Sequence, residues 1–137
     1  MQQLLQDTLD HLRTRQQFGV PLASFQVVAH RLADMHLVLV QAEALVYAAP
    51  AQIDRPAAPS EAAAAGIQAA VAGFQAAVAA AQVAVARACR TVSQGAVQLH
   101  GGMGMTDELR VGHAFKRLTL IERRAAASMP SCPGWCC

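Results

Sequence analysis

The sequence predicts an all-α protein built as an antiparallel four-helix bundle, and three observations indicate this fold. The chain has 137 residues, a common length for a single domain. Its composition is 54% hydrophobic but only 4% aromatic, and 30 residues are alanine, the strongest helix former. A β-sandwich would require more valine, isoleucine and aromatic pairs. Finally, apolar residues recur at helical spacing in four separate segments, so we expect four helices.

The first two helices are predicted over residues 2–17 and 23–49. In the first, one face of a short amphipathic helix is formed by Leu5, Leu9 and Leu12. The residues that follow end it, because Gly19 accepts a left-handed cap and Pro21 cannot continue the helical hydrogen bonds. The second helix has an apolar stripe, with spacings of three or four residues or sums of these, at Phe25, Leu32, Met35, Leu39 and Val46.

The third helix is predicted over residues 60–99, after a loop that contains three prolines. Ser60 can cap its start, and the carboxylate of Glu61 suits its first turn. A near-repeat of seven residues begins at Ile67, and apolar or small residues continue at alternating spacings of four and three as far as Leu99. This pattern is typical of the seam of a left-handed helical bundle. Because residues 62–86 contain no charge, we expect a central helix that is covered on most sides.

The uncharged segment 62–86 is also long enough to be considered as a membrane span. It consists mostly of alanine and contains Gln68, Gln75 and Gln82, whereas a membrane span is dominated by leucine, isoleucine, valine and phenylalanine. The first seven residues lack the basic region and the continuous apolar stretch of a signal peptide. We therefore expect no membrane span and a cytoplasmic protein.

The fourth helix is predicted over residues 106–124. Thr106 can cap its start, and its apolar face is formed by Leu109, Phe115, Leu118 and Ile121. Residues 1–124 thus form the predicted bundle domain. The apolar periodicity stops after it, and residues 125–137, which include three of the four cysteines, are expected to form a disordered tail. The remaining cysteine, Cys89, lies in the third helix and is expected in the core.

Charge and motifs exclude several classes of function. The formal net charge is only +2 and most basic residues are scattered, so we expect no nucleic-acid partner. His30 and Asp34 share a helix face, but the paired E-x-x-H motifs of di-iron bundles are absent, so no metal site is predicted. No G-K-[ST] follows the glycines of residues 101–104, which excludes a Walker-type phosphate loop. No G-x-S-x-G elbow accompanies them either, which argues against an esterase.

Two segments are not explained by helix packing. The first is R-Q-Q-F-G-V-P-L at residues 15–22, with Phe25-Gln26 shortly after it, and the second is Q-L-H-G-G-M-G at residues 98–104. Glycines allow backbone N–H groups to approach a ligand, and the forked guanidinium of Arg15 suits a phosphate or pyrophosphate. Each segment alone also fits a simpler role, because glycines cap helices and arginines are common on exposed helix faces.

At these two segments the chain resembles the C-terminal domain of the flavin-dependent acyl-CoA dehydrogenases. That family has an R-x-Q-F-G-x-P-L turn, matched at residues 15–22, followed by F-Q and by L-A-D-M, matched at residues 25–26 and 32–35. A later A-x-Q-x-H-G-G-x-G-x-T, matched at residues 96–106, closes the long helix. The resemblance covers about residues 5–122 and implies a four-helix domain of the acyl-CoA dehydrogenase type that forms subunit contacts.

The resemblance also implies that the domain completes a site for FAD, which is held mainly by missing domains or by the neighbouring subunit. By motif position, the residues expected to contact its pyrophosphate and adenosine are Arg15, Gln17, Phe18, Phe25, Gln26, Gln98, Gly101 and Gly102. The family dehydrogenates acyl-CoA thioesters between the α and β carbons, using a glutamate base and the flavin. The implied partners of a full enzyme are the acyl-CoA substrate, an electron-transfer flavoprotein, and further subunits in a homo- or hetero-oligomer.

The chain departs from the family pattern in two ways. The family's amino-terminal helical domain and middle β-domain have no counterpart here, so the fragment is not expected to be catalytic alone. The catalytic glutamate would fall near Ala125, and the neighbouring carboxylate, Glu122, stands about three positions early, one helical turn away. Some members with an F-K-R-L-T run, found here at residues 115–119, lack that glutamate and act beside a catalytic subunit. A non-catalytic helical oligomerisation module or partner subunit is therefore the alternative reading.

Overall fold

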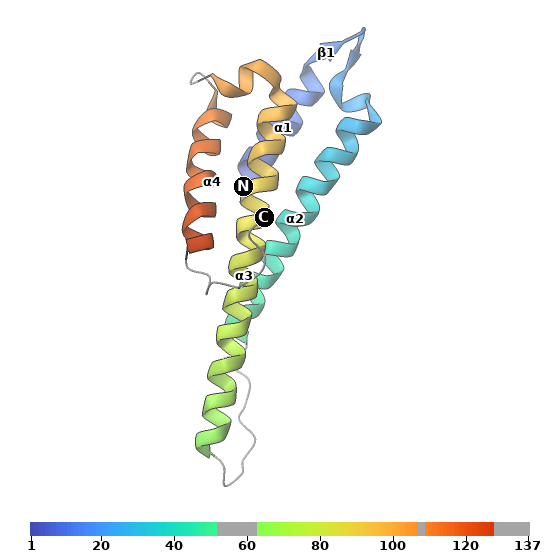
Figure 1. Ribbon diagram of the computed structural model, residues 1–137. Helices are drawn as coiled ribbons and strands as arrows, with labels where there is room; N and C mark the ends of the chain where they lie inside the picture. Colours follow the sequence, from blue (N-terminus) through green and yellow to red (C-terminus); the bar gives the residue numbers. More distant parts are fainter. Residues whose placement is uncertain (52–62, 107–108, 128–137) are drawn as a thin grey trace.

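The computed structural model describes residues 1–51, 63–106 and 109–127, and it confirms the all-α prediction (Figure 1). Its four helices are α1 (Gln2–Thr14), α2 (Gln26–Ala51), α3 (Ala63–His100) and α4 (Arg110–Ala127). Successive helices run in opposite directions, as in an up-and-down bundle. A two-stranded hairpin, β1 (Gln16–Gln17) with β2 (Val20–Pro21), and a short turn, η1 (Leu22–Ser24), connect α1 to α2, while η2 (Gly101–Met105) follows α3.

The helix α3 is the axis of the fold, because α1, α2 and α4 all pack against it. The core lies along its C-terminal half, where one cluster contains Leu4, Met35, Cys89, Val92, Ala96, Val111 and Leu118. Burial raises the pKa of the Cys89 thiol, as expected for a core cysteine. The N-terminal half of α3 extends beyond α1 and α4 in Figure 1, and residues 66–73 are exposed. Among the described residues, the expectation that α3 is covered on most sides is therefore not met over residues 66–73.

The buried face of α1 includes the predicted Leu12 and is otherwise shifted by one residue. Leu4, Thr8 and Leu12 are buried, whereas Leu5 and Leu9 are half-buried at the edge of a groove between α1 and α2. A threonine can occupy this inner position because its hydroxyl donates a hydrogen bond to the Leu4 carbonyl oxygen, 2.7 Å away. The hydrogen bond satisfies the buried hydroxyl, which would otherwise be costly in the core.

A glycine sets the separation of α2 and α3. A Cβ atom at Gly95 would lie 2.6 Å from the sulfur of Met35, which is fully buried on α2. The absence of a side chain at Gly95 therefore lets the two helices approach closely while Met35 fills the space between them.

Several helix ends differ from the predicted ones. The helix α1 ends at Thr14 instead of residue 17, because residues 16 and 17 pair with the second strand of the hairpin. The helix α2 begins at Gln26, since residues 22–24 form a 3-10 turn, and it continues through Pro50 to Ala51. The helix α4 begins at Arg110 and runs to Ala127, so the first three residues of the expected tail are helical. The expected cap at Ser60 and the rest of the tail lie outside the described residues.

Two segments have the length and hydropathy of membrane spans, namely Gln26–Ala51 and Gly66–Met105. Only their length and composition indicate membrane spans, and the core helix of a soluble protein can have the same length and hydropathy. In the present chain only 22% and 6% of their most apolar windows are buried. The expectation of no membrane span stays a prediction, and the low burial shows that α2 and α3 present apolar faces to their surroundings.

Candidate functional site

The first predicted site segment forms the hairpin that follows α1. Arg15 ends the helix by donating its backbone N–H to the His11 carbonyl oxygen at 2.8 Å, and its own carbonyl oxygen accepts from the Leu22 N–H at 2.9 Å. The two residues of the tip, Phe18 and Gly19, have positive φ angles of 55° and 79°. Such angles fit the tight turn of a two-residue hairpin, and phenylalanine adopts them at a steric cost. The phenyl ring of Phe18 is 91% exposed at the tip.

The hairpin and the start of α2 form one unit. The ring of Phe25 packs edge-on against Phe18, with centroids 6.4 Å apart and an angle of 81° between the planes. The Ser24 hydroxyl donates to the Pro21 carbonyl oxygen at 2.6 Å. The carbonyl oxygen of Phe25 accepts the first hydrogen bonds of α2, so exposed Gln26 lies at the positive end of that helix. Two aromatic rings and a helix N-terminus thus lie beside Arg15.

The second predicted segment forms the turn after α3. Gly101 has a φ of 62°, a left-handed conformation that ends α3 at His100. A Cβ atom built on Gly101 or Gly102 would meet nothing within 4 Å, so the backbone of both glycines is open. The Thr106 hydroxyl donates to the Met103 carbonyl oxygen at 2.8 Å and closes the turn. The result is an exposed stretch of backbone beyond the C-terminus of α3, where glycines allow a ligand to come close.

Two stacked histidines join the ends of α1 and α3. The rings of His11 and His100 lie 4.3 Å apart with an interplanar angle of 21°. Nδ1 of His100 lies 2.9 Å from the Ala96 carbonyl oxygen and donates to it. Burial, together with the nearby His100 and Arg15, holds the pKa of His11 below its ordinary value. This contact brings Arg15 and the glycine turn to the same end of the molecule.

All eight residues predicted to contact FAD lie at this end and are exposed. Gln98 borders a groove of about 450 Å³ between α2 and α3, which also contains His30, Arg31 and Asp34. Sequence reasoning missed His11, because a histidine one turn before Arg15 carries no signal until α1 and α3 are placed side by side. Among the described residues, no group of three or more histidine, cysteine, aspartate or glutamate side chains could hold a metal.

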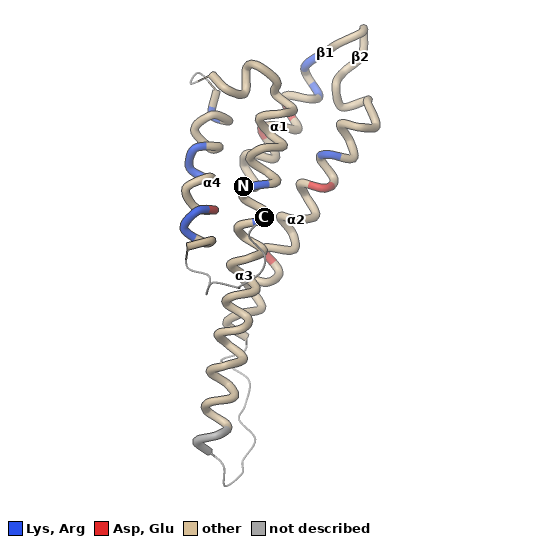
Figure 2. The backbone as a smooth tube through the Cα atoms, viewed as in Figure 1, with Lys and Arg blue, Asp and Glu red and all other residues tan. Residues whose placement is uncertain are grey.

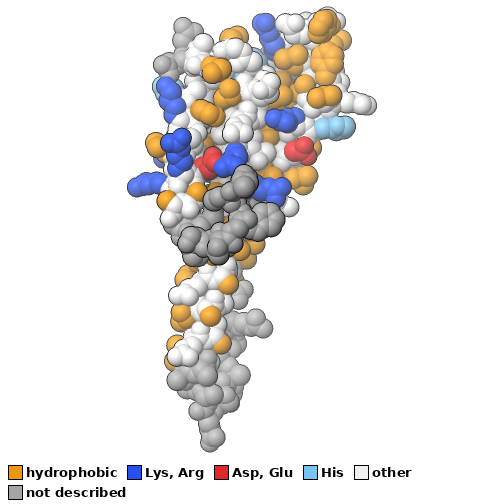
Figure 3. Space-filling view, viewed as in Figure 1, with side chains coloured by type: hydrophobic (Ala, Val, Ile, Leu, Met, Phe, Trp, Pro, Cys, Tyr) orange, Lys and Arg blue, Asp and Glu red, His pale blue; other side chains and the backbone are white. Residues whose placement is uncertain are grey.

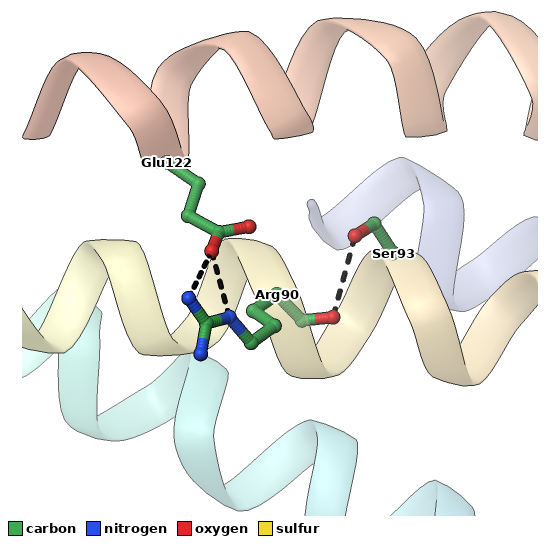
Figure 4. A network of polar contacts seen from close by, with 3 residues as sticks. All are labelled: Arg90, Ser93 and Glu122. Atoms are coloured by element: carbon green, nitrogen blue, oxygen red, sulfur yellow. Dashed lines mark hydrogen bonds and ion pairs between the residues drawn. The ribbon is translucent and has the colours of Figure 1, made fainter. Parts of the chain in front are cut away.

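The candidate base, Glu122, lies elsewhere. Its carboxylate accepts from Nε of Arg90 at 2.7 Å and forms an ion pair with Nη2 at 2.6 Å (Figure 4). The Glu122 side chain is only 16% exposed, and the pair links α4 to α3. Because a helix rises about 1.5 Å per residue, Glu122 lies about 18 Å along α4 from Arg110, away from the glycine turn. Its geometry is that of a structural ion pair.

Comparisons with known proteins give a consistent result. The family model described as acyl-CoA dehydrogenase, C-terminal domain, matches residues 1–122. The chain is 32% identical over 113 residues to acyl-CoA dehydrogenase IpdE2 of Mycobacterium tuberculosis (strain ATCC 25618 / H37Rv), covering 82% of this chain and 29% of that protein. A crystal structure of an FAD-dependent dehydrogenase matches with a TM-score of 0.69 and 25% identity, over 90% of this chain and 32% of the other.

A second solved structure agrees in fold. It is the ChsE4-ChsE5 complex from Mycobacterium tuberculosis, with a TM-score of 0.63 and 24% identity, over 95% of this chain and 35% of the other. The chain therefore spans about a third or less of the length of these proteins.

Proposed function

Because the chain belongs to the acyl-CoA dehydrogenase family, as its C-terminal domain, we propose that its hairpin and glycine turn contact the pyrophosphate and adenosine part of FAD. The flavin would be shared with other domains or with a neighbouring subunit. Its chemistry, when bound, is to accept a hydride from the substrate. The structural role proposed for this chain is to hold and orient the non-reacting end of the cofactor.

One observation supports the proposal most strongly. Two segments separated by some eighty residues in sequence, around Arg15 and around Gly101, lie at one end of the bundle because His11 stacks on His100. The guanidinium of Arg15 has no acidic partner among the described residues, and the backbone of Gly101 and Gly102 is open. A forked cation and an exposed glycine backbone together suit a dianionic pyrophosphate.

The remaining residues fit an adenosine. The exposed ring of Phe18, supported edge-on by Phe25, offers a flat apolar surface on which an adenine can stack. The amides of Gln17, Gln26 and Gln98 are exposed at the same end and can donate to or accept from ring nitrogens and ribose hydroxyls. The cation suits the pyrophosphate of FAD, the aromatic ring suits its adenine, and the amides suit its adenosine, so we propose FAD as the cofactor.

The full protein is proposed to dehydrogenate an acyl-CoA thioester between its α and β carbons, in fatty acid metabolism or a related pathway in the cytoplasm, and to pass electrons to an electron-transfer flavoprotein. Relatives named as acyl-CoA dehydrogenase support this. This chain alone is proposed not to catalyse the reaction, because Glu122 is held by Arg90 and lies away from the glycine turn.

Exposed apolar faces support a role in subunit contacts. Leu37 and Tyr47 on α2 are 59% and 80% exposed, and Ile67 on α3 is 62% exposed. Apolar grooves flank α2, one of about 480 Å³ beside α1 and one of about 600 Å³ beside α3. Helices that are apolar on several sides are stable when other helices cover them, so these faces are proposed to contact other domains or subunits of a homo- or hetero-oligomer.

The second candidate function is a helical association module or a non-catalytic partner subunit. It is favoured by the ion pair of Glu122 with Arg90, because Glu122 is the carboxylate nearest in sequence to Ala125, the expected position of the base. The two candidates differ in whether residues of this chain contact flavin in the assembly, and replacement of Arg15 separates them.

We expect Arg15→Ala, made in the full-length assembly, to weaken FAD binding by about 1.5–3 kcal/mol, the contribution of a charged hydrogen bond. This corresponds to roughly ten- to a hundredfold in the dissociation constant, measured by the loss of flavin absorbance on dialysis. Arg13→Ala is the matched control, since Arg13 is an exposed arginine two residues earlier on α1. Unchanged flavin retention in the Arg15 variant would favour the association module.

A further inference from the structure

The helix α4 holds an unusual share of the positive charge. Five of the 11 lysines and arginines of the chain lie within its 18 residues, together with one acid, Glu122. That acid turns inward to Arg90, so its charge does not offset those on the outer side. The basic residues lie at intervals along α4 (Figure 2), and the first of them, Arg110, forms an ion pair with Asp7 of α1 at 3.9 Å.

The outer face has an apolar centre. Leu120 is 64% exposed, although leucine is usually buried. Residues three and four positions away on a helix share its face, and at these positions stand Lys116, Arg117, Arg123 and Arg124. We call these five residues the α4 basic face. In the space-filling view, blue side chains gather along the edge of the molecule formed by α4 (Figure 3).

The composition of this face favours a protein partner with carboxylates. Three of the four cations are arginines, whose planar fork binds a carboxylate through two parallel hydrogen bonds. An exposed apolar side chain ringed by charges has the arrangement of a protein interface, with an apolar centre and a polar rim. A single leucine between cations offers little apolar area for insertion into a membrane. A nucleic-acid backbone would bind the cations through its phosphates, but its phosphates would make no apolar contact with Leu120.

We propose that the α4 basic face docks an acidic segment of a partner protein, with Leu120 as the apolar anchor and Arg117, Arg123 and Arg124 pairing with the partner's carboxylates. The hairpin and glycine turn take no part in this contact, so it is independent of the proposed FAD site. Because the cations are exposed, the contact forms fast and weakens as salt rises.

The test uses the purified chain and a fluorescent synthetic peptide in which leucines recur at helical spacing among glutamates. We expect saturable binding, measured by fluorescence anisotropy. The double variant Arg117→Glu/Arg124→Glu should weaken it about a hundredfold, and Leu120→Ala roughly tenfold. The matched control is Arg31→Glu/Arg87→Glu, which changes the net charge equally on α2 and α3 and should alter binding less than threefold.

Three results would overturn the proposal: no saturable binding, an equal loss in the control double variant, or no effect of Leu120→Ala. Duplex DNA and anionic phospholipid vesicles are tested in parallel. If either binds more tightly than the peptide and depends on the same arginines, the face recognises phosphates and the protein partner is rejected. The neutral variant Arg117→Gln/Arg124→Gln repeats the test without charge reversal, and circular dichroism verifies that each variant keeps its helices.

Discussion

The stacked histidines His11 and His100 lie at the same end of the molecule as Arg15, and the protonation of His11 affects the stability of this contact. The ring of His11 is partly buried against His100, with Arg15 close by, and its pKa is lowered. In the unfolded chain the same imidazole has its ordinary pKa, near 6.5. The unfolded state therefore binds a proton more readily than the folded state as the pH falls.

The first prediction is a loss of stability on mild acidification. A lowered folded-state pKa means that the contribution of His11 is fully present above about pH 6.5 and decreases as the pH falls below that value. His11→Phe keeps an aromatic ring against His100 but removes the proton site. We expect urea unfolding curves between about pH 7.5 and 5.5 to show a smaller fall in the free energy of unfolding for this variant than for the wild type. An equal fall in both proteins would refute the assignment.

The close packing of helices α2 and α3 depends on Gly95. A Cβ atom there would fall 2.6 Å from the sulfur of Met35, and Met35 is fully buried. The same helix contains Gly73, where an added Cβ would meet nothing within 4 Å. Gly95 and Gly73 thus differ, because an added side chain would be crowded at Gly95 and would meet open space at Gly73.

We expect Gly95→Ala to lower the free energy of unfolding by about 1–3 kcal/mol, because the methyl group overpacks the α2–α3 contact. Gly73→Ala is the control and should raise it by about 0.5–1 kcal/mol, since alanine is the better helix former at an open position. Both changes are measured by chemical denaturation. A stable Gly95→Ala protein would show that Met35 can move aside and that the glycine does not set the helix separation.

The helices were predictable from sequence because each carries a periodic apolar pattern of more than three turns. The two glycine-containing segments stood out because helix packing does not require them, and their contact with FAD stays a prediction. The hairpin after Arg15 was not predictable from sequence, since a two-residue strand has no pattern of its own. Its pairing depends on the positive φ angles at the tip. Thr8 was missed as a core residue of α1, because a threonine looks polar until its hydroxyl is hydrogen-bonded along the helix. The exposure of the first half of α3 depends on how far α1 and α4 extend, which local periodicity does not encode.

The molecule as a whole has the length of an independent domain, but much of its apolar surface is exposed, as in a domain that packs against others. Its core is confined to the C-terminal half of α3, and the apolar faces of α2 and α3 remain largely open. The groups proposed to contact FAD lie at one end and on the surface, not in an enclosed cavity. A cofactor held only from one side by exposed residues loses little water on binding, and its affinity for such a surface is low.

The flavin content of the purified chain tests this account most directly. The chain is mixed with excess FAD, freed of unbound cofactor by gel filtration, and examined for flavin absorbance and for dye reduction with an acyl-CoA. We predict a colourless protein without dehydrogenase activity, because the domain supplies only part of the cofactor site and the candidate base, Glu122, is paired with Arg90. A yellow protein that reduces the dye would contradict the account, since it would mean that these helices alone form a complete active site.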